Sequence, residues 1–152
     1  MRTRNRGQVL ILVALALVAL MGFAALAVDV GFLFTVRNQL QRCADSGALA
    51  GASAFVGGGS TPATRVTANI QALDYASRDA VGPSPLDSAT EVFVSFPLPF
   101  TANRIRVNTR RTVNLFFARV FGGNTTTINA FASAEAIVPP PSPPAPRIRL
   151  VE

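Results

Sequence analysis

Histidine, lysine and tryptophan are absent from this chain of 152 residues, and Cys43 is its only cysteine. Without histidine, neither a Ser-His-Asp nor a Cys-His nucleophile system can be assembled. The Cys/His clusters that usually hold zinc are excluded for the same reason. The commonest forms of nucleophilic and zinc-dependent catalysis are therefore ruled out.

Paired catalytic carboxylates and phosphate-binding loops are also missing. The acidic side chains show no spacing typical of an acid–base pair; those considered are Asp45, Asp74, Asp79, Asp87, Glu91 and Glu135. The glycine cluster at 57–59 lacks the Lys-Ser/Thr that completes a P-loop. We therefore expect no enzyme and no cofactor or metal. A membrane-tethered enzyme would need an acid-pair mechanism using Asp74, Asp79 and Glu91.

The single cysteine excludes a disulfide within the chain, so packing must stabilise any folded domain. Cys43 lies in an alanine-rich segment. That setting favours a small buried residue, and the alternative is a disulfide between two chains.

Arginine supplies every basic residue, with 14 basic against 8 acidic side chains. A nucleic-acid-binding surface would need clustered basic residues interleaved with stacking aromatics. The closest approach is the group Arg104, Arg106, Arg110 and Arg111. This group falls on one predicted strand and is explained as its solvated face, so we expect no nucleic-acid partner.

Residues 8–28 form a run of Leu, Val and Ala without a charged side chain, and Arg2, Arg4 and Arg6 precede it. Twenty-one helical residues reach roughly 30 Å, the thickness of a bilayer's hydrocarbon core. We predict a single-pass anchor over 8–36, with residues 1–7 in the cytoplasm because basic flanks stay inside. The rest of the chain is then exported from the cytoplasm.

The alternative to an anchor is a cleaved signal peptide, for which 24–27 (AALA) offers a weak cleavage match. Apolar residues continue past Asp29 to Val36, which favours a retained anchor. Asp29 itself has two interpretations: an acid at the membrane interface, or an acid with a specific role between subunits.

The helical pattern continues beyond the anchor. Small and apolar residues recur at three- and four-residue spacing, namely Leu40, Ala44, Gly47, Ala48, Gly51, Ala52 and Phe55. Gly47 and Gly51 form a small-xxx-small pair, which lets another backbone approach closely. We expect a tight contact at this face, either with the chain's own domain or with a neighbour.

A second helix is predicted from Pro62 to about Val81, because glycines at 57–59 precede it and the segment 82–85 (GPSP) stops it. Its apolar face is expected to be Val66, Ile70, Leu73 and Ser77, and its outward residues Arg65, Asn69 and Arg78.

Alternating patterns then predict three strands. They lie near 92–96, at 104–110 with Ile105, Val107 and Thr109 inward, and at 125–138 with alanines inward. Between the last two, apolar residues at 113, 116, 117, 120 and 121 predict a short amphipathic helix ending at Gly122. The fold class is α+β, with a domain at 37–138 and a polyproline tail at 139–152. A long helix leading into a small antiparallel sheet is the general plan of pilin-like subunits.

Several segments match one family pattern. They are RGQ at 6–8, AVDVG at 27–31, RNQLQ at 37–41 and ADSGALAGA at 44–52, followed by RVNT at 106–109 and VNLFFARVFG at 113–122. These segments resemble TadE/TadG-like proteins, which are associated with assembly of Flp pili by the tight-adherence system. The chain differs from longer relatives in lacking an Asp-x-Ser-x-Ser metal motif. It differs from type IV prepilins because cleavage after Gly7 would put Leu12 where those proteins have Glu.

The resemblance implies a structural or assembly component in the bacterial inner membrane. Its expected partners are the bilayer and other pilus or secretion subunits, and the resemblance also allows a homo-oligomer. Asp29, Asp45, Gly47 and Gly51, with Ala48 and Ala52 beside them, become candidate packing positions. The competing hypothesis is an exported binding module that holds an acidic surface through Arg104, Arg106 and Arg110.

Overall fold

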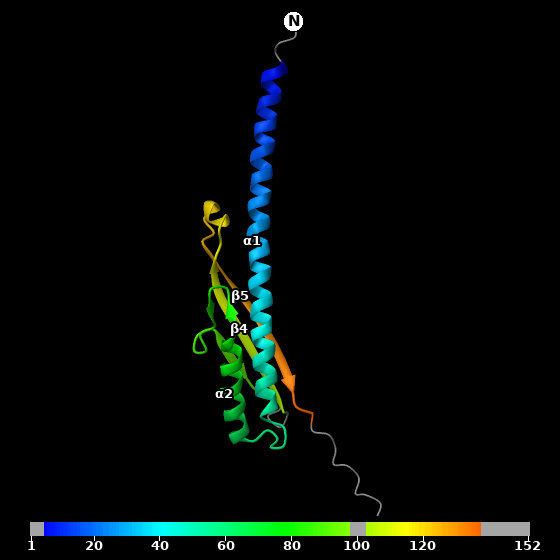
Figure 1. Cartoon of the computed structure of the whole chain (residues 1–152), viewed down its shortest axis with the longest axis vertical. Helices are drawn as coiled ribbons and strands as arrows, with labels where there is room; N and C mark the ends of the chain where they lie inside the picture. Colours follow the sequence, from blue (N-terminus) through cyan, green and yellow to red (C-terminus); the bar gives the residue numbers. More distant parts are fainter. Residues whose placement is uncertain (1–4, 98–102, 138–152) are drawn as a thin grey trace, which may run out of the picture.

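The computed structural model describes residues 5–97 and 103–137 (Figure 1). Arg2 and Arg4 of the predicted cytoplasmic segment, Val138 of the predicted third strand and the tail at 139–152 lie outside the described residues.

One long helix, α1 (Asn5–Ser53), dominates the molecule. At about 1.5 Å per residue its 49 residues span about 73 Å. Its N-terminal half projects away from the rest of the chain, and its C-terminal half packs against the domain (Figure 1). Among the described residues, this is the one helix that is long and apolar enough to cross a membrane. It ends before Gly57 and Gly59, both of which adopt positive φ.

The second helix, α2 (Pro62–Arg78), begins as the sequence predicts. Thr61 caps it, forming reciprocal hydrogen bonds with Thr64, and Pro62 occupies the first turn. The helix ends three residues earlier than predicted. The chain then forms a two-residue ladder, β1 (Ala80–Val81) with β2 (Ser84–Pro85), around Gly82 at φ +68°.

The predicted apolar face of α2 is wrong at Val66 and Ile70, which are exposed, whereas Leu73 packs half-buried against the core as predicted. The fully buried residues of this helix are Ala68, Ala72 and Ala76. The reason is the α1 surface opposite, whose glycines bring the two helices so close that only methyl-sized side chains fit between them.

The predicted three-stranded antiparallel sheet is confirmed, with the order β3 (Val92–Ser95), β4 (Arg104–Asn114) and β5 (Thr125–Glu135). Val107 lies opposite Val94 on one side and Ala132 on the other. The α+β class is confirmed as well.

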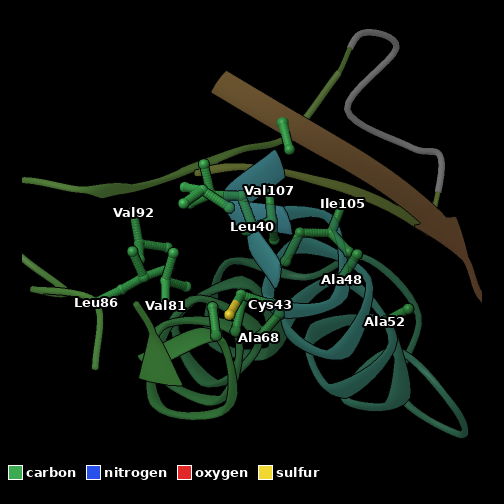
Figure 2. Packing of buried hydrophobic residues seen from close by; sticks show 14 of the residues in the cluster. Leu40, Cys43, Ala48, Ala52, Ala68, Val81, Leu86, Val92, Ile105 and Val107 are labelled. Carbon is green, nitrogen blue, oxygen red and sulfur yellow. The ribbon is translucent and has the colours of Figure 1, made fainter. Parts of the chain in front are cut away.

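The core lies between the inner face of this sheet and the two helices (Figure 2). Ile105, Val107 and Thr109 are buried there, as their alternation predicts. The Thr109 hydroxyl donates a hydrogen bond to the Leu40 carbonyl of α1 at 3.0 Å. This bond satisfies a buried hydroxyl and ties the sheet to the helix.

The amphipathic helix predicted at 113–121 is wrong. Strand β4 runs on to Asn114, paired with Thr125, so the residues that would start the helix belong to a ladder. Beyond this strand the chain forms a single turn of 3-10 helix, η1 (Ala118–Phe121), closed by Gly122 in the left-handed region at φ +88°. We call residues 115–124, which join β4 to β5, the hairpin tip.

Candidate functional site

The hairpin tip is bound to α1 by the Asp29 carboxylate. Asp29 is only 3% exposed. Its Oδ1 accepts a hydrogen bond from the Phe116 N–H at 2.9 Å, and its Oδ2 accepts from the N–H groups of Phe117 at 3.0 Å and Ala118 at 2.8 Å. Ala118 is the first residue of η1, and Phe117 and Phe116 directly precede it, so Asp29 caps this turn from a helix that is distant in the sequence.

An aromatic contact reinforces this attachment. The rings of Phe32 on α1 and Phe116 on the tip meet edge to face, with centroids 5.3 Å apart. Both contacts lie within one turn of α1, and the large apolar side chains that precede this turn are exposed. The packing of the domain on α1 therefore begins at Asp29, inside the segment 8–36 that we expected to be anchor.

We expected Asp29 either to lie at the membrane interface or to act between subunits, and predicted no partner for it within the chain. The structure gives it three backbone partners almost ninety residues away. The sequence signal was a lone acid in an apolar segment, which predicts that some partner exists. Backbone donors carry no side-chain signature, so the sequence could not identify them.

The glycine pair of α1 contacts α2 of the same chain. A Cβ added at Gly47 would lie 2.8 Å from the Ala72 carbonyl oxygen and 2.8 Å from the Ala76 Cβ. A Cβ at Gly51 would collide with the Ile105 side chain and lie 3.0 Å from the Ala68 carbonyl oxygen. The small-residue face is thus filled by the chain's own helix, which decides between the two expected contacts at this face.

The remaining candidate packing residues divide into two kinds. Ala48 and Ala52 are buried and belong to the core cluster (Figure 2). Asp45 is exposed and accepts a hydrogen bond from Gln41 Nε2, one turn earlier, at 3.0 Å. Asp45 therefore lies on the solvent side of α1, away from the packed face.

The three arginines of the candidate binding face already contact their own chain. Arg104 forms an ion pair with Glu135 at 2.6 Å. Arg106 lies over the ring of Phe131, and Arg110 over the ring of Phe93, at 4.3 and 4.6 Å from the centroids. The outer face of the sheet thus presents arginine–aromatic stacks.

Arg111 does not belong to that outer face, and our assignment of it to the solvated side is wrong. It shares the inward register of Ile105, Val107 and Thr109, and only 11% of its side chain is exposed. Its guanidinium pairs with Glu91 at 2.7 Å and donates to backbone carbonyls of Val81, Ser84 and Pro85. The spacing of two from Thr109 was a signal that could have identified it.

This ion pair shifts both titrations. The hydrogen bond from Arg111 lowers the pKa of the Glu91 carboxyl, against the opposing effect of burial, and the same bond raises the pKa of Arg111. The pair therefore remains charged at neutral pH and links β4 to the β1–β2 ladder.

A cleft of about 740 Å³ separates the β1–β2 ladder from the hairpin tip. Phe32, Arg111, Phe116 and Arg119 are among its lining residues. Within the described residues, no group of three or more His, Cys, Asp or Glu side chains could hold a metal ion.

Two family models match the sequence. The Flp pilus-assembly TadE/G-like model matches residues 7–54, which cover most of α1. The Tad-like Flp pilus-assembly model matches residues 35–134, which cover the folded domain and the hairpin tip. No curated protein and no solved structure matches the chain. Since the second model alone spans well over half of the 152 residues, the chain belongs to the Tad-like Flp pilus-assembly family.

Proposed function

We propose that this protein is a single-pass structural component of a Flp (tight-adherence) pilus or related secretion apparatus. It is anchored in the bacterial inner membrane by α1 and carries no catalytic activity. The observation that supports this most strongly is the division of α1 into two halves. The N-terminal half, called the bare half, has exposed side chains, whereas the C-terminal half packs against the domain. The side chains from Val9 to Val28 contribute almost nothing to the core, whereas Val36, Leu40 and Cys43 form part of it.

The dimensions favour a membrane for the bare half. From Gly7 to Val28 the helix rises about 33 Å, close to the thickness of the hydrocarbon core. Large apolar side chains cover this stretch and are mostly more than half exposed. The arginines before it orient the N-terminus toward the cytoplasm, and the domain then lies on the periplasmic or outer side.

The continuity of α1 supports a mechanical role. The same helix forms the anchor and the centre of the domain, with no loop at residues 29–40 to absorb motion. The domain is further tied to the helix by the Asp29 contacts and the Thr109–Leu40 hydrogen bond. A pull on the domain is thus transmitted to the anchor, as an assembly subunit requires.

We assign docking of other subunits to the outer sheet face with its Phe93 and Phe131 stacks. Arginine and aromatic residues together are enriched at the centres of protein interfaces. The Gly47/Gly51 face acts within the chain and is not proposed as a contact between subunits, because α2 fills it.

The competing function is a released module that holds an acidic surface through Arg104, Arg106 and Arg110. It receives less support, because Arg104 is neutralised by Glu135 and the other two arginines are stacked on aromatic rings.

Gene replacement separates the two functions. In a strain lacking the gene, we expect loss of Flp pili, counted by electron microscopy, and restoration by the full chain. A version in which residues 1–28 are exchanged for a cleavable signal peptide would release the domain into the periplasm. We expect that version to be stable but unable to restore pili. Full restoration by the released domain would overturn the anchored-subunit proposal in favour of the released module.

A further inference from the structure

We propose that the hairpin tip is a second membrane-contact element, in which Phe116, Phe117 and Val120 enter the lipid at the outer interface of the bilayer. The inference rests on the anchor proposed above and adds a part of the domain to the membrane-bound surface. Asp29 positions this element beside the helix.

The level of the tip along α1 is the first argument. Asp29 directly follows the uncharged segment that ends at Val28, and it binds the tip backbone. When the anchor fills the hydrocarbon core, its outer boundary falls near this residue. The tip therefore lies where the acyl chains meet the headgroups. In Figure 1 it is the part of the domain that reaches furthest toward the N-terminal half of α1.

The surface of the tip is the second argument. Phe116 is 63% exposed, Val120 is 82% exposed, and Phe117 is also exposed. Through the contact of Phe116 with Phe32, this apolar surface continues onto α1, whose neighbouring Val28 and Val30 are exposed too. A contiguous apolar surface of this kind marks an interaction site. Its continuity with the anchor identifies lipid as the occupant.

The backbone of the tip is the third argument, because polar groups that approach lipid must be paired within the protein. Phe116, Phe117 and Ala118 donate to Asp29. Four further N–H groups donate to carbonyls within the tip, namely those of Leu115, Val120, Gly122 and Gly123. The exposed Arg119 has a long apolar stem that lets its guanidinium reach headgroup phosphates.

The absence of tryptophan from the sequence permits a direct test. Single tryptophans are introduced into the full chain as Val120→Trp on the tip, Leu17→Trp in the anchor and Val56→Trp as control. Val56 is a valine of similar exposure that lies just beyond the C-terminal end of α1, whereas the tip is bound near the middle of this helix at Asp29. The proteins are placed in phosphatidylcholine vesicles brominated either near the headgroup or deep in the acyl chain.

We expect the emission of Leu17→Trp to be quenched by deep bromines, and that of Val120→Trp to be blue-shifted and quenched by shallow bromines. Val56→Trp should be unquenched. If Leu17→Trp is quenched while Val120→Trp behaves like Val56→Trp, the tip proposal fails and the anchor stands. If Leu17→Trp is unquenched, both fail. If the tryptophan of Val120→Trp is not quenched, and its emission is blue-shifted only at high protein density, the tip contacts a second copy of the chain. That result also overturns the proposal.

Discussion

The Asp29 carboxylate and the Phe117 backbone amide are 88 residues apart in the sequence and form a hydrogen bond of 3.0 Å. The bond joins the point where α1 leaves the domain to the far end of the β4–β5 hairpin. Together with the bonds from Phe116 and Ala118, it pairs an acidic group that lies within the apolar helix α1. The position that looked most unfavourable in the sequence is thus a structural attachment.

Replacing Asp29 by alanine should release the hairpin tip. Three partly buried backbone donors would lose their acceptor. Leaving a buried donor unsatisfied costs about 1–3 kcal/mol per group, and these partly buried donors should fall at the lower end of that range. We expect the amides of Phe116, Phe117 and Ala118 to exchange hydrogen faster, measured by hydrogen–deuterium exchange in detergent.

Asp45→Ala is the matched control on the same helix, because Asp45 is exposed and contacts Gln41 alone among the described hydrogen-bond partners. It should leave exchange at the tip unchanged. Equal protection of the tip in Asp29→Ala and in the unmodified chain would contradict the attachment.

Adding a side chain to the glycine pair should separate α1 from α2. Gly47→Leu would drive its side chain into the Ala72 carbonyl and the Ala76 methyl group. Overpacking of a close helix contact typically costs about 1–3 kcal/mol, and here the obstacle includes backbone. We expect a lower midpoint of thermal unfolding, followed by circular dichroism in detergent.

Gly31→Ala provides the comparison within the same helix. A Cβ at Gly31 would meet no atom within 4 Å. Since alanine is favoured over glycine in helices by about 1 kcal/mol, this variant should be as stable as the original or more so. If Gly47→Leu and Gly31→Ala had the same midpoint of thermal unfolding, α2 would not fill the glycine face.

Glu91→Gln should weaken the connection between β4 and the β1–β2 ladder. Hydrogen bonds between charged groups contribute about 2 kcal/mol. The pKa of Glu91 is lowered in the folded state from its ordinary value of 4.5. The ionised carboxylate therefore contributes to the stability of the fold above pH 4.5. The contribution is lost as the pH falls through the folded pKa. The stability difference between the original chain and Glu91→Gln should therefore be full at pH 7 and shrink below pH 4.5.

Glu135→Gln is the control for this pH series. Glu135 pairs with Arg104 on the surface, where both side chains are nearly half exposed, and such pairs contribute about 0–1 kcal/mol. A difference for Glu91→Gln that is no larger than for Glu135→Gln at pH 7 would contradict the role given to the buried pair.

The Cys43 thiol should resist modification in the folded chain. It is buried between the two helices and the sheet (Figure 2). Burial, with a further effect of the nearby Asp79 charge, raises the pKa of the thiol. Since the thiolate is the reactive form, maleimide labelling should be slow under native conditions and complete after denaturation. Rapid native labelling, or dimers that disappear on reduction, would favour the disulfide between chains instead.

Sequence patterns predicted the structure best where a pattern is compatible with only one environment for each side chain. Alternation at Ile105, Val107 and Thr109 predicted their burial because each side chain of such a strand points either to the covered face or to the solvent. The small-residue spacing around Gly47 predicted a close contact. It could not tell whether the contact lay within the chain, because a glycine face fits any partner of complementary shape.

The failures share a different physical cause. In α2 the apolar residues Val66 and Ile70 are exposed because the neighbouring helix leaves space only for alanines. At the segment predicted to form an amphipathic helix, the first residues belong instead to the β4–β5 ladder, which runs through Asn114. Both outcomes are decided by a distant partner, which a local pattern does not contain.

We propose that α1 remains in the membrane and holds the domain outside the cytoplasm. Alkaline extraction of membranes, combined with protease treatment of spheroplasts and mass spectrometry of the protected peptides, tests this proposal. Our account predicts that the chain stays with the extracted membranes, that residues 8–28 are retained and protected, and that the domain is digested from outside. A chain that is recovered in the soluble fraction and begins after Ala27 would contradict it.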